Sequence, residues 1–265
     1  MSVKGFMIDV QGTLIDDIEK KPIEGSIEAL SHLKRIGMPF VLVTNNTKRE
    51  SSDFKAYLRG LGFEFSESQY LDPLMVLDSS LAPCKVAAYG TSTFLKTLEN
   101  RGYTLEYEVP EAVLVSIKED FTNLEFSEMI EALLAGAKLV GMHETSLYAK
   151  SGRRYPGVGA ILKMLSFATG RDYFVVGKPS VRFYEEALKK LQMQNGSITF
   201  EDIVMISDDL AGDLRGAHEL QMRTVLVLSG KISSLKEGGD LGGWKPDWVS
   251  ERVGEWFKSY EKGAA

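Results

Sequence analysis

The chain has 265 residues, of which 31 are Lys or Arg and 37 are Asp or Glu, so its formal net charge is −6. Because domains run to roughly 150 residues, this length indicates one large domain or a core that carries a second, smaller one. The acidic balance argues against nucleic acid as a partner, since nucleic-acid-binding proteins present a basic surface. No run approaches the roughly 18 apolar residues that a transmembrane helix needs, so no membrane partner is expected.

The single cysteine, Cys84, excludes a disulfide framework and fits a reducing compartment. The first residues lead directly into a short apolar run, without the longer apolar stretch of a signal peptide. We therefore expect a cytoplasmic protein.

Short apolar runs alternate with helical patterns along the chain. In chain order, the pattern predicts strand 6–10, helix 25–36, strand 40–43, helices 51–61 and 73–81, strand 86–89, helix 93–100, strand 112–115, helix 125–135, strands 138–142 and 174–176, helix 181–191, strand 203–206, helix 210–220 and strand 224–228. The glycine-rich stretch 231–246 is interpreted as a surface loop.

This alternation predicts an α/β fold. Strands that alternate with helices form right-handed βαβ units around a parallel sheet. The strands are near-continuous runs of Val, Ile and Leu, which indicates that helices cover both faces of the sheet. We therefore expect a Rossmann-like parallel sheet.

Polar side chains follow four of the predicted strands. They are Asp9 with Gly12-Thr13, Thr44-Asn45-Asn46, Lys178 within Gly177-Lys178-Pro179, and Ser207-Asp208-Asp209 with Asp213 beyond. Open parallel sheets place ligands beyond the carboxyl ends of their strands, so these residues are expected to converge in one crevice. No comparable polar residues follow the strands at 86–89 and 113–117. The middle of the chain is therefore interpreted as an insertion.

The four strand ends together suit phosphoryl transfer. The carboxylates of Asp9 and Asp208 would repel each other in one crevice, and a hard divalent cation such as Mg²⁺ would relieve that repulsion. Thr44 and Asn45 supply uncharged donors and Lys178 a point charge, which suits a tetrahedral anion. An Asp in such a site can attack phosphorus and form an aspartyl-phosphate.

Each of these motifs alone has an ordinary structural explanation. An Asp after a strand is most often a helix N-cap or an Asx turn, and Asp209 or Asp213 could be only that. Thr-Asn-Asn is commonly a turn, and Gly-Lys-Pro an ordinary loop. The coincidence of all four, each at a strand end and in this order, favours the functional interpretation.

These motifs resemble those of the haloacid-dehalogenase (HAD) superfamily of aspartyl-phosphate hydrolases. Asp9 to Leu14 is similar to its first motif, Asp-x-Asp-Gly-Thr, and the other three strand ends are similar to its second, third and fourth motifs. The long insertion is typical of subclass IIA, the branch of NagD-like and para-nitrophenyl phosphatases. The resemblance implies a HAD core at 1–78 and 176–265, with a large α/β cap at 79–175 inserted into it.

The resemblance also implies roles for the motif residues. Asp9 would be the nucleophile and a ligand of Mg²⁺, with Asp208 and the backbone carbonyl of Gln11 as further ligands. Thr44, Asn45, Asn46 and Lys178 would hold the phosphoryl group, and Lys178 would also neutralise charge beside Asp9. Gly12, Thr13, Asp209 and Asp213 would support the site, Asp213 by orienting the metal shell. In the cap, 143–157 is a candidate substrate-facing segment with Tyr148, Arg153, Arg154 and Tyr155, although an exposed turn is the alternative for its arginines.

Gln11 is the main departure from the family pattern. The family has a second Asp there, whose side chain protonates the leaving oxygen. Gln11 keeps the backbone carbonyl but cannot supply a proton, and general acid–base catalysis typically contributes about 10²–10⁴-fold. We therefore expect a Mg²⁺-dependent phosphatase of low activity that favours leaving groups needing little protonation, such as aryl or acyl phosphates.

Three other functions remain open at the level of sequence. The chain could bind Mg²⁺ and phosphate, or a protein, without turnover. It could be a phospho-acceptor signalling domain, for which the insertion has no use, or a dehalogenase, which would not need Asp208. The expected partner is a small phosphorylated molecule, which includes phosphoamino acids and acyl phosphates. Caps of this kind often pair, so a homodimer through the cap is a candidate assembly.

Overall fold

The computed structural model describes residues 3–150, 153–238 and 243–261. The chain divides by contact into two compact units. The first unit comprises the described residues of Met1–Thr44, Lys55–Leu71 and Tyr184–Ala265, and the second comprises Asn45–Phe54 and the described residues of Asp72–Phe183. This division reflects contact alone, so the proposed core at 1–78 and 176–265 and cap at 79–175 stay a prediction.

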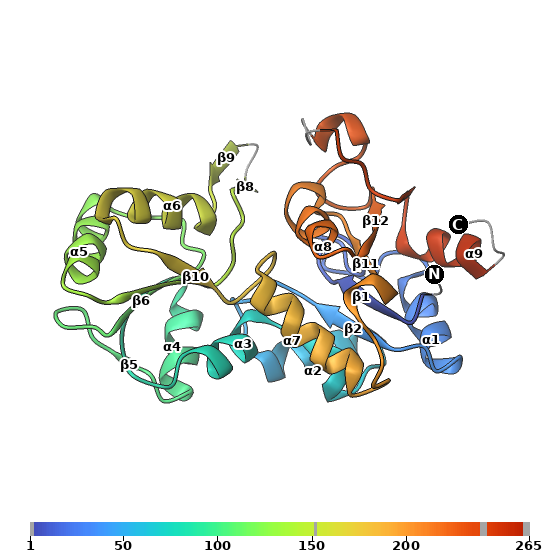
Figure 1. Ribbon diagram of the computed structural model, residues 1–265, viewed down its shortest axis with the longest axis horizontal. Coiled ribbons are helices and arrows are strands. Elements are labelled where there is room, and N and C mark those ends of the chain that lie inside the picture. The colour runs from blue at the N-terminus through green and yellow to red at the C-terminus, as the bar shows by residue number, and fades with distance from the viewer. Residues whose placement is uncertain (1–2, 151–152, 239–242, 262–265) are drawn as a thin grey trace. The chain divides into compact units, whose positions relative to one another are not determined.

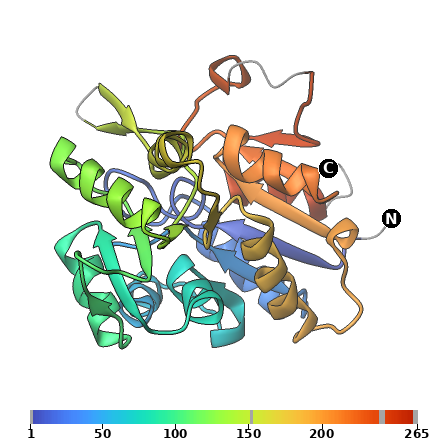
Figure 2. The same cartoon turned by 60° about the vertical axis from the view of Figure 1, so that its left-hand side comes forward.

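Among the described residues, the first unit holds a six-stranded sheet, here the first sheet, in the order β13-β12-β11-β1-β2-β3. Its strands are β1 (Gly5–Asp9), β2 (Phe40–Val43), β3 (Tyr70–Leu71), β11 (Ile203–Ser207), β12 (Arg223–Val227) and β13 (Trp248–Ser250). Every neighbouring pair is parallel, as predicted. Strands β1 and β11 lie side by side with Ile8 opposite Ile206 (Figure 2).

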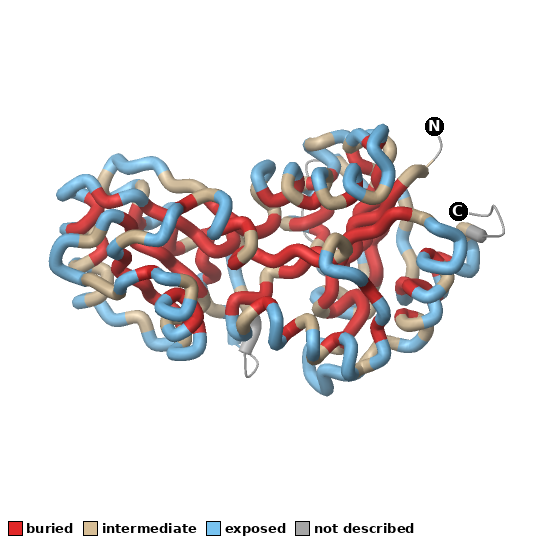
Figure 3. The backbone as a smooth tube through the Cα atoms, turned by 90° about the horizontal axis from the view of Figure 1, so that it is seen from below, coloured by how far each residue is buried: buried red, intermediate tan, exposed pale blue. Residues whose placement is uncertain are grey.

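The strands of the first sheet are buried because helices cover them. The helices are α1 (Ser26–Arg35), α2 (Ser51–Gly60), α7 (Val181–Gln192), α8 (Arg215–Glu219) and α9 (Val253–Glu261), with short 3-10 turns at Glu67–Gln69, Phe200–Asp202 and Leu235–Gly238. The ring of Phe6 on β1 meets Trp256 and Phe257 of α9 edge-on, at centroid distances of 5.9 and 5.2 Å. Figure 3 shows β1 and its neighbours as a continuous buried layer.

The predicted helix 210–220 is present, but it begins as a π-helical turn, Leu210–Leu214, that leads into α8. The backbone N–H of Leu214 donates to the carbonyl of Asp209, five residues earlier. The Asp209 carboxylate accepts the N–H of Gly212 at 2.9 Å and so caps the start of the turn. Apolar spacing alone does not distinguish a π turn from an α turn.

The second unit is built on another parallel sheet, here the second sheet. Within the described residues its order is β10-β7-β6-β4-β5, formed by β4 (Lys85–Tyr89), β5 (Thr104–Leu105), β6 (Ala112–Val115), β7 (Lys138–Gly141) and β10 (Tyr173–Val175). The unit also contains α3 (Pro73–Ser80), α4 (Ser92–Asn100), α5 (Asn123–Leu134) and α6 (Val158–Thr169). A hairpin is formed by β8 (Leu147–Lys150) and β9 (Arg153–Pro156). Helices α5 and α6 bury one face of this sheet, and α4 lies on its other side (Figure 1).

Strand β10 corrects one sequence-based expectation. The strand that precedes Lys178 pairs with β7 in the second sheet, with Phe174 opposite Val140, rather than joining the strands that precede Asp9, Thr44 and Asp208. A short apolar strand carries no mark of the sheet it will join, because either sheet can bury it. Three of the four strand ends therefore belong to the first sheet.

Within the described ranges, no helix is both long enough and apolar enough to cross a bilayer.

Two glycines bring α1 and α9 into close contact. A Cβ on Gly254 would lie 2.7 Å from the Cα of Gly25 and 2.8 Å from its carbonyl oxygen. We predict that Gly254→Ala lowers the free energy of unfolding by about 1–3 kcal/mol, because backbone must move to admit the methyl group. Gly60→Ala is the matched control, since a Cβ there meets nothing within 4 Å. Urea denaturation that finds the two variants equally stable would contradict this account.

Candidate active site

Two carboxylates are buried at neighbouring strand ends of the first sheet. Asp9 ends β1 and is 5% exposed, and Asp208 follows β11 and is 2% exposed. Burial raises the pKa of Asp208 well above its ordinary value, and the charge of Asp9 raises it further, while Lys231 opposes the shift. The two carboxyl groups therefore interact, and burial together with the charge of Asp9 disfavours ionisation of Asp208.

The carboxylate of Asp208 lies against backbone on two sides. A Cβ on Gly12 would lie 2.1 Å from its Oδ2, and one on Gly230 would lie 1.9 Å from the same atom. The backbone N–H of Lys231 donates to this oxygen at 2.7 Å. The hydroxyl of Ser229 donates to the carbonyl of Gly12 at 2.7 Å and so joins the two loops. Only residues without a Cβ let both loops approach the carboxylate this closely.

The loop Ser229-Gly230-Lys231 was missed in the sequence analysis. It directly follows β12, so the strand-end argument applied to Asp9, Thr44 and Asp208 could have found it. The ammonium of Lys231 pairs with Asp209. Burial lowers the pKa of Lys231, but the carboxylates of Asp209, Asp213 and Asp208 outweigh burial, and the pKa is raised. Lys231 is therefore a cation at this acidic cluster.

Ser207 and Tyr184 hold Asp213 in place. The hydroxyl of Ser207 donates to Oδ2 of Asp213 at 2.8 Å and accepts the backbone N–H of Asp209 at 3.1 Å. The phenol of Tyr184 donates to the backbone carbonyl of Asp213 at 2.8 Å. Burial raises the pKa of Tyr184, as do the nearby charges of Asp213, Asp209 and Asp9. The phenol therefore remains a neutral donor.

Gln11 and Thr44 are in direct contact. The hydroxyl of Thr44 donates to Oε1 of Gln11 at 2.6 Å, and Thr44 follows Val43, the residue of β2 that lies opposite Asp9. The hydroxyl of Thr13 donates to Oδ2 of Asp9 at 3.3 Å. The first unit thus brings together Asp9, Gln11, Thr13 and Thr44 from β1, β2 and the loop after β1.

The remaining predicted residues lie in the second unit. Oδ1 of Asn45 accepts the backbone N–H of Lys178 at 2.8 Å, and Nδ2 of Asn45 donates to the Lys178 carbonyl at 3.3 Å. The amide of Asn46 donates to the carbonyl of Arg49 at 2.9 Å. The side chain of Lys178 is buried, with 2% exposure. The predicted residues therefore fall into two groups, one in each unit.

The donors of the first unit fit a hard cation. Across the described ranges, no group of three or more His, Cys, Asp or Glu residues could hold a metal ion. The predicted ligands include only two such side chains, Asp9 and Asp208, with the backbone carbonyl of Gln11 as the third, and they stay a prediction. Carboxylate and carbonyl oxygens are the ligands that Mg²⁺ prefers, and a divalent cation would relieve the repulsion that raises the pKa of Asp208.

The candidate substrate-facing segment at 143–157 contains the β8–β9 hairpin. Ser151 and Gly152 of this segment lie outside the described residues. Tyr148 and Tyr155 are cross-strand neighbours, and their rings stack at a centroid distance of 5.4 Å. Arg153 and Arg154 are exposed, as an ordinary turn would also allow.

Comparison with known proteins identifies two segments of the chain. Residues 6–104 match the family described as haloacid dehalogenase-like hydrolase, and residues 175–256 match the family described as HAD-hydrolase-like. The human haloacid dehalogenase-like hydrolase domain-containing protein 2 is 30% identical over 237 residues, which cover 89% of this chain and 88% of the relative. The bovine phospholysine phosphohistidine inorganic pyrophosphate phosphatase is 28% identical over 240 residues, covering 87% of this chain and 84% of that protein.

Solved structures share the fold over nearly the whole length. A p-nitrophenyl phosphatase from Archaeoglobus fulgidus matches with a TM-score of 0.83 at 24% identity, over 98% of this chain and 100% of that one. NagD from Escherichia coli K-12 matches with a TM-score of 0.76 at 25% identity, over 96% and 98% of the two chains. The expected subclass IIA architecture, a parallel core sheet and a separate parallel sheet in the insertion, is confirmed.

We predict that Ser207→Ala lowers the free energy of unfolding by about 1–3 kcal/mol. The substitution removes the donor to Asp213 and the acceptor of the Asp209 N–H at a fully buried position. Ser31→Ala, on the exposed side of α1, is the control and should change stability by less than about 0.5 kcal/mol. Guanidinium denaturation measures both. Equal stability of the two variants would mean that Ser207 does not support Asp213.

Proposed function

The chain belongs to the haloacid dehalogenase-like hydrolase family, and from this membership we propose that it is a Mg²⁺-dependent phosphatase that acts through an aspartyl-phosphate on Asp9. The observation that carries the proposal is the buried pair of carboxylates at the ends of β1 and β11, one of which has a strongly raised pKa. The free-energy cost of burying two such charges would be offset by a cation bound between them.

In the proposed reaction, Asp9 attacks phosphorus and the bond to the leaving oxygen breaks. The leaving oxygen keeps the bonding electrons and takes a proton from solvent, and water then hydrolyses the aspartyl-phosphate to inorganic phosphate. The contact between Thr13 and Oδ2 of Asp9 restricts rotation of the carboxylate. A fixed carboxylate can hold one oxygen toward the substrate, which lowers the entropic cost of attack.

Asp9, Asp208 and the backbone carbonyl of Gln11 would hold the Mg²⁺. The ion would neutralise charge on the phosphoryl oxygens. Lys231 donates its backbone N–H to Asp208 and pairs its ammonium with Asp209, so it restrains both carboxylates. We propose that Thr44 and Lys178 bind the phosphoryl group and that Asp213 supports the acidic cluster.

Gln11 restricts the range of substrates in this proposal. Its Oε1 accepts a hydrogen bond from the Thr44 hydroxyl, and its amide N–H groups can donate hydrogen bonds but do not transfer a proton to a leaving oxygen. Leaving groups that depart without protonation are therefore favoured, which points to small aryl or acyl phosphates. Two similar proteins are named as a p-nitrophenyl phosphatase and as a phospholysine phosphohistidine inorganic pyrophosphate phosphatase.

The second candidate is a protein that binds Mg²⁺ and a phosphate ester without turnover. The contact between Gln11 and Thr44 favours it, because the Thr44 hydroxyl proton is directed to an amide oxygen. Calorimetry that detects ester binding, together with an assay that detects no phosphate release, would support this candidate over a phosphatase.

Asp9→Asn is expected to abolish hydrolysis of para-nitrophenyl phosphate, because an amide oxygen is too weak a nucleophile to form the acyl phosphate. Removal of Mg²⁺ with EDTA should abolish hydrolysis by the wild-type protein, and added Mg²⁺ should restore it. Asp17→Asn is the control, since this carboxylate is exposed and pairs only with Lys20 among the ion pairs described around it. Full activity of Asp9→Asn would remove Asp9 from the role of nucleophile.

Gln11→Asp is expected to raise kcat on an alkyl phosphate by up to about 10²-fold, the lower end of what general acid catalysis contributes. The rate on para-nitrophenyl phosphate should rise much less, because that leaving group needs little protonation. Gln11→Asn is the matched control, since it shortens the side chain in the same way but cannot donate a catalytic proton. An equal gain in both variants would attribute the effect to space rather than to proton transfer.

A further inference from the structure

Asn45 makes two hydrogen bonds to one residue that lies 133 positions further along the chain. Its Oδ1 accepts the backbone N–H of Lys178 at 2.8 Å, and its Nδ2 donates to the backbone carbonyl of the same residue at 3.3 Å. A residue in a neighbouring antiparallel strand would bond to Lys178 in the same two-point way. The two bonds restrain both peptide groups that flank the Lys178 Cα, whereas one bond would restrain only one of them.

Gly177 makes room for this contact. A Cβ at position 177 would lie 2.3 Å from the carbonyl oxygen of Met142 and 2.7 Å from Oδ1 of Asn45. Any side chain there would therefore push the Asn45 amide away from the Lys178 backbone. The N–H of Ser180 donates to the Gly177 carbonyl at 3.0 Å and closes the turn, and the N–H of Glu144 donates to the Lys178 carbonyl at 3.3 Å. The backbone around Lys178 is thus held from several sides.

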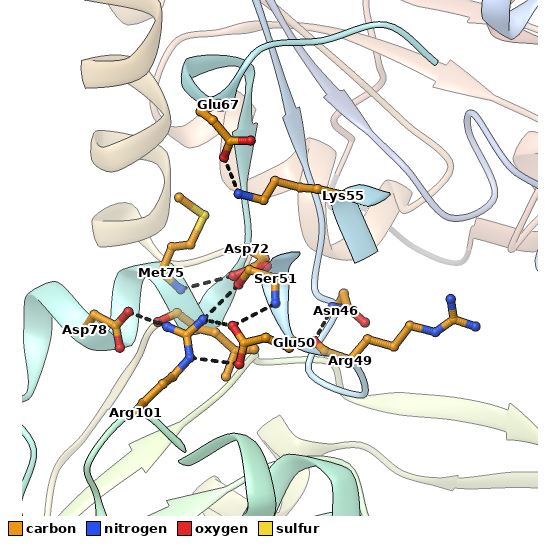
Figure 4. Close-up of polar contacts among 11 residues, drawn as sticks. Asn46, Arg49, Glu50, Ser51, Lys55, Glu67, Asp72, Met75, Asp78 and Arg101 are labelled. Atoms are coloured by element: carbon orange, nitrogen blue, oxygen red, sulfur yellow. Dashed lines mark hydrogen bonds and ion pairs between the residues drawn. The ribbon is translucent and has the colours of Figure 1, made fainter. Parts of the chain in front are cut away.

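The segment that carries Asn45 is itself fixed within the second unit. The hydroxyl of Ser116, after β6, donates to Oγ1 of Thr47 at 2.9 Å, and both residues are buried. Arg101, after α4, pairs with Glu50 and with Asp78 of α3 (Figure 4). Burial alone would lower the pKa of Arg101, but the carboxylates of Glu50 and Asp78 outweigh it and the pKa is raised. Asn45 is therefore a rigid support for its partner.

We propose that Asn45 is a positioning residue, whose side chain acts on the reaction through the backbone of Lys178 rather than by contact with the phosphoryl group. This inference rests on the proposed function, in which the Lys178 ammonium neutralises phosphoryl charge. A fixed backbone restricts the positions that the ammonium group of the buried Lys178 can reach. Preorganised charge stabilises a transition state without reorganisation during the reaction, so the position of the ammonium affects kcat more than substrate affinity.

A double-mutant cycle tests the proposal with para-nitrophenyl phosphate and Mg²⁺. Asn45→Ala should lower kcat by about 10–100-fold, the effect of a misplacement near 1 Å, with a much smaller change in KM. Lys178→Met removes the ammonium but keeps the backbone. If Asn45 acts only through Lys178, Asn45→Ala should cost nothing further in the Lys178→Met protein. Equal losses in both backgrounds would overturn the proposal, because direct substrate contact or a general loss of packing gives that result.

Gly177→Ala disturbs the same contact from the other side without removing a polar group. It should reproduce the loss of kcat, and it replaces Asn45→Ala in the cycle if that variant does not fold. Asn100→Ala, at the exposed end of α4, is the control and should keep wild-type kinetics. Wild-type kcat in folded Gly177→Ala would contradict the positioning role.

Single-turnover kinetics with excess enzyme and para-nitrophenyl phosphate carry the cycle if Lys178→Met is too slow for steady-state assays, with the same expectation that the two losses in rate do not multiply. A wild-type protein without Mg²⁺-dependent hydrolysis would overturn the proposed function and this inference with it. An active wild-type protein in which the losses multiply would overturn the positioning role alone.

Discussion

The burial of two mutually repelling carboxylates, Asp9 and Asp208, is the constraint that the surrounding loops of the first unit must satisfy. Asp9 and Asp208 end neighbouring strands, and the loops at Gly12 and Gly230 close over Asp208 without a Cβ between them. Burial of charge is costly, and here Lys231 offsets only part of the cost at Asp208, since the pKa of that carboxyl stays raised. A raised carboxyl pKa is what a nearby cation would lower.

Much of the surrounding structure restrains these charges. Ser207 and Tyr184 hold Asp213, Asp209 pairs with Lys231, and the Asp209 carboxylate also caps the π-helical turn that follows. Ser207, Asp209 and Asp213 therefore all make polar contacts within the first unit. This explains why a Ser at 207 is compatible with the site, because its hydroxyl joins two of the carboxylate-bearing residues.

Thr44 and Asn45 are neighbours in sequence but belong to different compact units. Thr44 bonds to Gln11 of the first unit, whereas Asn45 bonds to the Lys178 backbone of the second. The single motif Thr-Asn-Asn therefore supplies two different supports. When a motif is identified from sequence, its residues are all taken as ligands. Only the contacts of each side chain distinguish a residue available to the substrate from a residue that positions a neighbouring catalytic group.

The sequence by itself determined the α/β class, most of the strands and helices, and the acidic strand ends, because periodicity and strand-end chemistry are local properties of the chain. It did not identify α6, α9 or the β8–β9 hairpin. Its strand-end argument grouped the strand before Lys178 with three strands of another sheet, although the predicted cap at 79–175 includes most of that strand. Tertiary structure alone decided that β10 joins the second sheet, that Ser229 to Lys231 closes over Asp208, and that the Asn45 amide bonds to the Lys178 backbone. The physical reason is that each of these depends on pairing between residues far apart in the chain, and an apolar strand, a glycine or an amide is compatible with many partners until packing selects one.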